Sequence, residues 1–132
     1  MRTPKTAKLR QHKPRTSSTT RFLFERAAMT QATRRRLPDR RSSITFDVEA
    51  FHLRFTVTAS PFNDGSIGEL FIQNHKADSG AGIMASDSAI AASLALQYGC
   101  PPETLRKALS RDARGNPSGP LAAALDKLAV QP

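Results

Sequence analysis

The residues able to carry chemistry in this chain of 132 residues are few and far apart. Cys100 is the only cysteine, which excludes an internal disulfide and a disulfide-stapled secreted scaffold. His12, His52 and His75 lack the close spacing of metal ligands, and no second thiol accompanies them. A predicted helix end just before Cys100 opposes thiolate formation, so we interpret this cysteine as a buried small residue. The sequence therefore predicts no catalytic residue, no metal site and no cofactor.

One stretch has the composition of an anion-binding loop. Asp78-Ser79-Gly80-Ala81-Gly82 precedes a predicted helix, and glycines there would let a phosphate approach the unpaired amides of the first turn. Ser79, Gly80 and Gly82 are therefore predicted to contact a phosphate or a nucleotide. The alternative is a capping loop with Asp78 or Ser79 at the N-cap, since the stretch lacks the Lys-Ser or Lys-Thr of a P-loop.

A cluster of arginines offers a different chemistry. Five of them fall within eight residues: Arg34, Arg35, Arg36, Arg40 and Arg41. Such a cluster can neutralise phosphates, so these residues are predicted to contact a polyanion, with nonspecific binding of nucleic acid as the expected result. A small basic nucleic-acid-binding protein is accordingly the alternative function.

The remaining carboxylates give weaker indications. Asp87 lies within the predicted long helix, either as a buried acid near a site or as a residue at a solvated edge. Asp64 has a role in a turn, and nothing in the sequence places it and Glu69 at a distance useful for acid–base chemistry.

The net charge of +9 is unevenly divided along the chain. Residues 1–41 hold thirteen Lys and Arg against two acidic residues, whereas residues 42–132 hold seven against nine. Residues 1–33 are predicted to be a disordered basic tail, with Met29 as an alternative start, and residues 34–132 a folded domain. No apolar run has the length of a membrane span or follows a basic start as in a secretory signal, so we expect a soluble cytoplasmic protein without membrane contact.

Two runs of alternating apolar and polar residues, 44–48 and 53–57, predict a hairpin of two antiparallel strands. Asp64-Gly65 predicts a turn, because glycine adopts positive φ without steric cost. A third strand is predicted over 67–73. Apolar residues on both of its sides indicate that it is the most covered of the three.

Three helices are predicted after the strands, over 82–98, from 102 onwards and over 120–130. The first carries apolar residues at helical spacing, which form a stripe: Ile83, Ile90, Ala91, Leu94 and Tyr98. Gly99 fits the position that ends a helix, and Pro101-Pro102 prevents its continuation. The expected fold is α+β, a three-stranded antiparallel meander packed against one long helix, with two shorter C-terminal helices.

Three stretches resemble a known family when taken in order: Arg34-Arg35-Arg36-Leu37-Pro38, Gly68-Glu69-Leu70-Phe71-Ile72 and Ser93-Leu94-Ala95-Leu96-Gln97-Tyr98-Gly99. They resemble the TSCPD domain found near the C-terminus of cobalamin-dependent ribonucleotide reductases. The turn at Asp64-Gly65 and the loop Asn116-Pro117-Ser118-Gly119-Pro120 also resemble that domain. The resemblance covers roughly residues 34–128.

The resemblance implies a link to deoxyribonucleotide synthesis and DNA replication, under the family label ribonucleoside-diphosphate reductase. Such a reductase needs a cysteine that becomes a thiyl radical, a reducing pair and a second C-terminal pair, whereas this chain has Cys100 alone. We therefore expect a noncatalytic accessory module that binds a reductase subunit or a nucleotide. A domain of this size buries a modest core, which also favours a homo-oligomer or docking on a larger partner.

Overall fold

The computed structural model describes residues 33–76 and 78–130. Three strands come first, β1 (Ile44–Ala50), β2 (Leu53–Pro61) and β3 (Ile67–Asn74), in one antiparallel sheet of order β1-β2-β3. They are followed by α2 (Gly80–Gln97), α3 (Pro102–Ala108) and α4 (Pro120–Val130). The predicted α+β class and meander are confirmed. The predicted tail lies outside the described residues except for Thr33.

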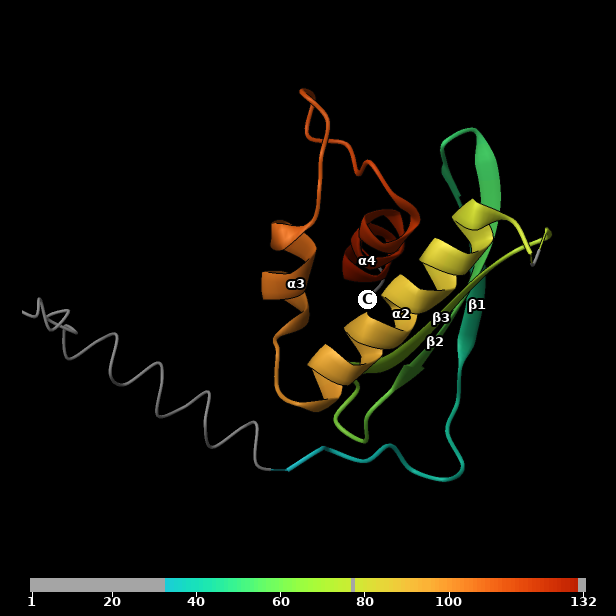
Figure 1. Cartoon of the computed structure of the whole chain (residues 1–132). Helices are drawn as coiled ribbons and strands as arrows, with labels where there is room; N and C mark the ends of the chain where they lie inside the picture. The colour runs from blue at the N-terminus through green and yellow to red at the C-terminus, as the bar shows by residue number, and fades with distance from the viewer. Residues whose placement is uncertain (1–32, 77, 131–132) are drawn as a thin grey trace, which may run out of the picture.

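The helices α2 and α4 cover one face of the sheet, and α3 packs against α4 away from the sheet (Figure 1). The core forms between these layers, where Phe55, Val57 and Leu70 are fully buried. Among the described residues, no helix has the length and apolar character needed to cross a membrane.

The prediction that the third strand is the most covered was wrong. β3 lies at an edge of the sheet, and Phe71 on its outer face is 46% exposed. The central strand is β2, whose Phe55, Val57 and Ala59 are fully buried. Apolar residues occur on both sides of β3 because one face of the strand packs in the core, whereas the other face carries the exposed Phe71.

The apolar stripe predicted on the long helix does not face the core. The buried face of α2 instead carries small residues, Ala85, Ala89 and Ala92, whereas Ile83, Ile90, Leu94 and Tyr98 are all exposed. Small side chains let α2 approach the open edge of β3 closely. There the Ser93 hydroxyl accepts a hydrogen bond from Leu70 N–H at 2.8 Å and lies 3.0 Å from the Leu70 carbonyl, which satisfies backbone groups that the edge strand would leave unpaired.

The helix boundaries follow local chemistry. Ser79 is the N-cap of α2, and its hydroxyl accepts a hydrogen bond from Gly82 N–H at 3.0 Å. Gly99 follows the helix with φ +102°, as the sequence predicts. Pro102 and Pro120 begin α3 and α4, where the missing amide proton costs nothing.

The hairpin turn between β1 and β2 consists of Phe51 and His52, with φ of +57° and +59°. A two-residue turn of this kind favours Asn and Gly because both residues need positive φ. Two bulky residues there store strain of about 1–2 kcal/mol each. The turn places an exposed phenylalanine at the tip of the hairpin.

Candidate functional site: a clasp around Gln97 and an apolar pocket

The three stretches that carry the family resemblance meet at the end of α2. Gln97 is 3% exposed, and its side chain donates a hydrogen bond to the Gly68 carbonyl at 3.0 Å and accepts one from Arg34 Nε at 2.6 Å. The Gln97 carbonyl also accepts a hydrogen bond from Arg35 N–H at 2.8 Å. We call these four residues, Arg34, Arg35, Gly68 and Gln97, the Gln97 clasp. It joins the segment from Arg34 to Pro38, which we call the basic lead, to the third strand and the end of the long helix.

An aromatic layer extends the clasp. The Arg35 guanidinium lies 3.9 Å from the centre of the Phe62 ring and 2.9 Å from the Asp64 carboxylate. Phe62 in turn lies directly on Gly68, because a Cβ built there would be 2.7 Å from the ring. Hydrogen bonds from Ser66, followed by Arg35, lower the pKa of Asp64 to about 2. Asp64 therefore has the turn role that the sequence predicts and also anchors the lead.

The five arginines predicted to contact a polyanion have different roles. Arg34 and Arg35 belong to the clasp, and Arg41 forms an ion pair with Glu69 at 2.8 Å. Arg36 and Arg40 are exposed. Polyanion binding stays a prediction, but three of the five guanidinium groups also hold the lead against the fold.

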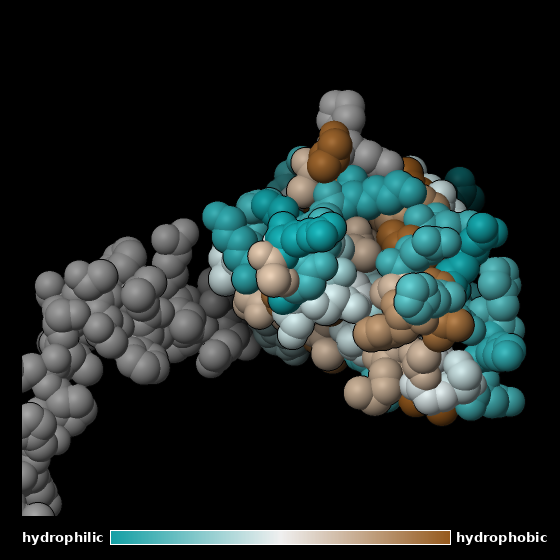
Figure 2. All heavy atoms as spheres, turned by 90° about the horizontal axis from the view of Figure 1, so that it is seen from above, coloured by the Kyte–Doolittle hydropathy of each residue, from teal (hydrophilic) through white to brown (hydrophobic). Residues whose placement is uncertain are grey.

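An apolar cavity lies at the other end of α2. It has a volume of about 440 Å³ and is lined mainly by apolar groups, among them Phe51, Met84, Leu109 and Leu121. We call it the Phe51 pocket. Figure 2 views this end of the molecule, where brown and tan apolar atoms lie between teal hydrophilic ones. The Phe51 ring closes one side over Gly119, where a Cβ would lie 3.9 Å from Cζ.

The residues predicted to contact a phosphate do not line one cavity. Gly80 borders the Phe51 pocket, whereas Gly82 is buried and borders a different cavity of about 260 Å³ beside Ile72. The Ser79 hydroxyl caps α2 and donates a hydrogen bond to the Lys76 carbonyl at 2.8 Å. The capping alternative thus describes Ser79, and phosphate binding by the stretch stays a prediction.

The other chemical candidates remain apart in the fold. Cys100 is half-buried rather than buried, and its thiol lies 3.6 Å from the Pro101 carbonyl. Asp87 is exposed on α2, at the solvated edge rather than in a buried site. Among residues 33–76 and 78–130, no group of His, Cys, Asp and Glu side chains could hold a metal ion.

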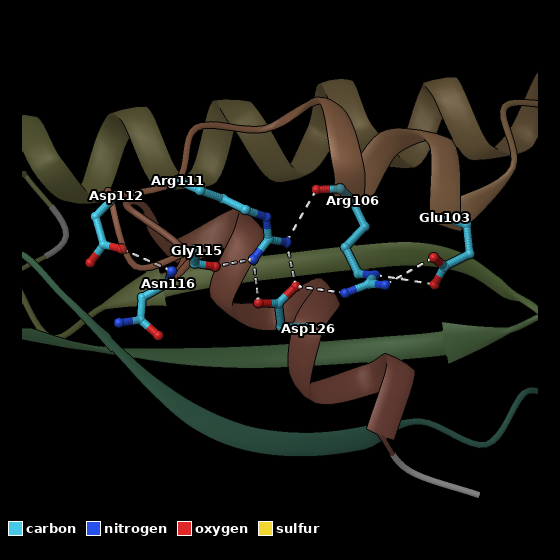
Figure 3. A network of polar contacts seen from close by, with 7 residues as sticks. All are labelled: Glu103, Arg106, Arg111, Asp112, Gly115, Asn116 and Asp126. Carbon is cyan, nitrogen blue, oxygen red and sulfur yellow. Dashed lines mark hydrogen bonds and ion pairs between the residues drawn. The ribbon is translucent and has the colours of Figure 1, made fainter.

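A polar network holds the segment that forms one wall of the pocket (Figure 3). Asp126 on α4 accepts two hydrogen bonds from Arg111, at 2.6 and 2.8 Å, and one from Arg106 at 3.2 Å. Arg106 also binds Glu103, and Arg111 donates to the Gly115 carbonyl. The network ties α3 and the loop after it to α4, and this loop begins with pocket residues Leu109 and Ser110.

The network predicts a loss of stability in acid. Hydrogen bonds from Arg111, then Arg106, hold the pKa of Asp126 below its usual value. A lowered folded-state pKa gives stability that is present above the unfolded pKa, near 4, and is lost as the pH falls through the folded value. We expect Asp126→Asn to lower the free energy of unfolding by about 1–2 kcal/mol at pH 7. The difference from wild type should shrink between pH 5 and pH 2 in urea titrations.

The control for that experiment is Glu49→Gln, which neutralises an exposed carboxylate on β1. At pH 7 the free energy of unfolding of this variant should differ from that of wild type by no more than about 0.5 kcal/mol. An Asp126→Asn deficit that is the same at pH 7 and pH 2 would show that the charge of Asp126 is not what stabilises this corner.

The fold and its contacts define a small α+β domain with a basic lead clasped to the end of its long helix and an apolar pocket at the other end. The model of the TSCPD domain family matches residues 24–128. The chain belongs to this family, and the predicted resemblance is confirmed.

Two curated relatives carry the same name. A vitamin B12-dependent ribonucleotide reductase of Agrobacterium fabrum is 40% identical over 70 residues, which cover 53% of this chain and 6% of the relative. That of Bradyrhizobium diazoefficiens is 33% identical over 88 residues, covering 67% of this chain and 7% of the relative. The chain thus spans less than a tenth of these relatives and is a ribonucleotide-reductase-related domain. No solved structure matches it significantly.

Sequence reasoning missed both the Phe51 pocket and the role of Gln97. The pocket had a signal, since a hairpin turn of Phe51-His52 lacks the Asn and Gly that positive φ favours. Gln97 was visible only as part of a family motif, because its partners Arg34 and Gly68 are 63 and 29 positions away.

Proposed function

We propose that this chain is a noncatalytic docking module in deoxyribonucleotide production that binds a ribonucleotide reductase chain in the cytoplasm. The observation that carries the proposal is the Phe51 pocket, an apolar cavity of about 440 Å³. A cavity of this size accepts an apolar side chain with its flanking backbone. The partner is taken from the relatives, which are named vitamin B12-dependent ribonucleotide reductases.

The rim of the pocket supports a binding role. Phe51 is 62% exposed and Met84 is 71% exposed, so two large apolar groups stand free beside the cavity. Strained backbone conformations cluster at functional sites. Phe51 has a positive φ of +57° and an exposed side chain, so packing in the core does not account for its strained backbone. Buried aromatic and methionine side chains are enriched at the centres of protein interfaces.

A catalytic role has less support in these 132 residues. The reduction requires several cysteines according to the family resemblance, and Cys100 is the single one in the sequence. It also lies at the C-terminal end of α2, whereas the Phe51 pocket lies at the N-terminal end. Cys100 and the pocket therefore do not form one site.

The experiment measures binding of the purified full chain to the purified ribonucleotide reductase of the same cells, by calorimetry. We expect Phe51→Asn to weaken the complex at least about tenfold, because an anchoring aromatic residue is lost. Asparagine tolerates positive φ, so the variant should fold as stably as wild type. Thermal unfolding checks this point.

The matched control is His52→Gly, which relieves strain in the same turn at a residue that does not line the pocket. It should leave the affinity unchanged and raise the free energy of unfolding by up to about 1 kcal/mol. Equal affinities of Phe51→Asn and wild type would refute the pocket as the docking site. No binding of the wild type would refute the proposed function itself.

A further inference from the structure

The two outer strands of the sheet carry backbone groups that no neighbouring strand pairs, and helix side chains reach both edges. At the edge formed by β3, Ser93 and Gln97 of α2 bind backbone groups of the strand. At the edge formed by β1, Lys127 of α4 donates a hydrogen bond from Nζ to the Asp47 carbonyl at 3.0 Å. An unpaired edge is a template for another strand, so a side chain bound there stands in the way of pairing.

The hairpin turn determines which groups of β1 point away from the sheet. Ala50 and Leu53 flank the two-residue turn and form a hydrogen-bonded pair, and from there residues of β1 face β2 and the open edge in alternation. The residues whose N–H and C=O groups point outward are therefore every second one, Thr45, Asp47 and Glu49. The bond from Lys127 to the Asp47 carbonyl agrees with this alternation and meets the middle residue of the three.

Two contacts hold the Lys127 side chain against β1. Besides the bond to the Asp47 carbonyl, its Nζ atom lies 5.1 Å from the centre of the Phe46 ring, whose face attracts a cation. Among residues 33–76 and 78–130, the ammonium group forms no ion pair with a carboxylate. The charge thus lies at a backbone carbonyl of the open edge, where an added strand would have to displace it or bury it at a large cost.

We propose that Lys127 keeps the β1 edge closed, and that without it β1 pairs with β1 of a second copy of this chain. The strand has apolar residues on its core side, and Ile44 at its start is 42% exposed. In the antiparallel register that sets the two Phe46 residues opposite each other, Thr45 lies opposite Asp47. No carboxylate of β1 is then directly opposite another, so identical strands are compatible at this edge.

The test compares the self-association of the full chain and its variants by light scattering over a concentration series at physiological salt. Lys127→Met keeps the length of the side chain but removes the charge and the donor. We expect it to associate at a concentration at least about tenfold below that of wild type. The control Lys107→Met makes the same change at an exposed position of α3, away from the sheet, and should associate like wild type.

A proline shows whether the association uses β1. The N–H of Thr45 points outward, so Thr45→Pro removes a donor of the open edge without breaking a bond to β2. In the Lys127→Met background, this change should return self-association to the wild-type concentration range. Thermal unfolding checks that each variant is folded.

Two results overturn the proposal. Equal association of Lys127→Met and Lys107→Met at every concentration would mean that Lys127 does not keep the edge closed. Association of Lys127→Met that survives Thr45→Pro would place the contact on another surface, such as the exposed face of α2. Lys127 does not line the Phe51 pocket, so Lys127→Met should still bind a reductase, and this proposal and the proposed function can fail separately.

Discussion

Replacing Gln97 with leucine should lower the free energy of unfolding by about 2–4 kcal/mol. Leucine has a similar size but neither donates to the Gly68 carbonyl nor accepts from Arg34, both of which Gln97 does. A buried carbonyl left without a partner costs about 1–3 kcal/mol, and loss of a hydrogen bond from a charged group adds to this. Urea unfolding followed by circular dichroism measures the change.

The control is Gln73→Leu, the same chemical change at an exposed position of β3. It should alter the free energy of unfolding by no more than about 0.5 kcal/mol. Because Gln97 holds the basic lead, limited proteolysis should also cut Gln97→Leu after Arg34 or Arg35 faster than wild type. A variant as stable and as resistant as wild type would show that the clasp is not needed for the fold.

Replacing Gly68 with alanine should cost about 1–3 kcal/mol, because the new methyl group overlaps a packed ring. A Cβ at this position would be 2.7 Å from the Phe62 ring, which is 5% exposed and lies under the Arg35 guanidinium. The ring cannot move without displacing Arg35. The change therefore acts on the lead as well as on the sheet, and thermal unfolding measures its effect.

Gly80→Ala is the matched control, since a Cβ at Gly80 meets no atom within 4 Å. Alanine in the first turn of a helix should leave stability unchanged or raise it by up to about 1 kcal/mol. If Gly68→Ala were as stable as Gly80→Ala, the contact of Phe62 with β3 would be loose, and the family glycine would need another explanation.

The clasp also changes how the basic segment should be removed in experiments. Deletion of residues 1–41 would take away Arg34, Arg35 and Arg41, which bind Gln97, Asp64 and Glu69. Lost binding to a polyanion or a reductase would then be confounded with lost stability. A deletion that ends at residue 32 leaves these contacts intact and isolates the effect of the upstream residues.

Much of the secondary structure was predictable because its causes are local. Alternation of apolar and polar residues predicted β1 and β2, and the prolines at 102 and 120 predicted the starts of two helices. Gly99 predicted the end of α2 through its positive φ. Each of these signals depends on neighbours within a few residues, so the sequence contains it directly.

Local patterns were enough to predict the strands, the helices and the family of this domain, whereas the buried face of each element depends on how the elements pack against one another. The large apolar residues of α2, such as Ile90 and Leu94, formed the obvious stripe, yet Ala85 and Ala89 face the sheet. The physical reason is close approach: a helix that hydrogen-bonds the edge of β3 through Ser93 and Gln97 needs small residues beside it. The distance between α2 and β3 depends on the side chains of both elements, so the periodicity of α2 alone does not predict which of its faces is buried.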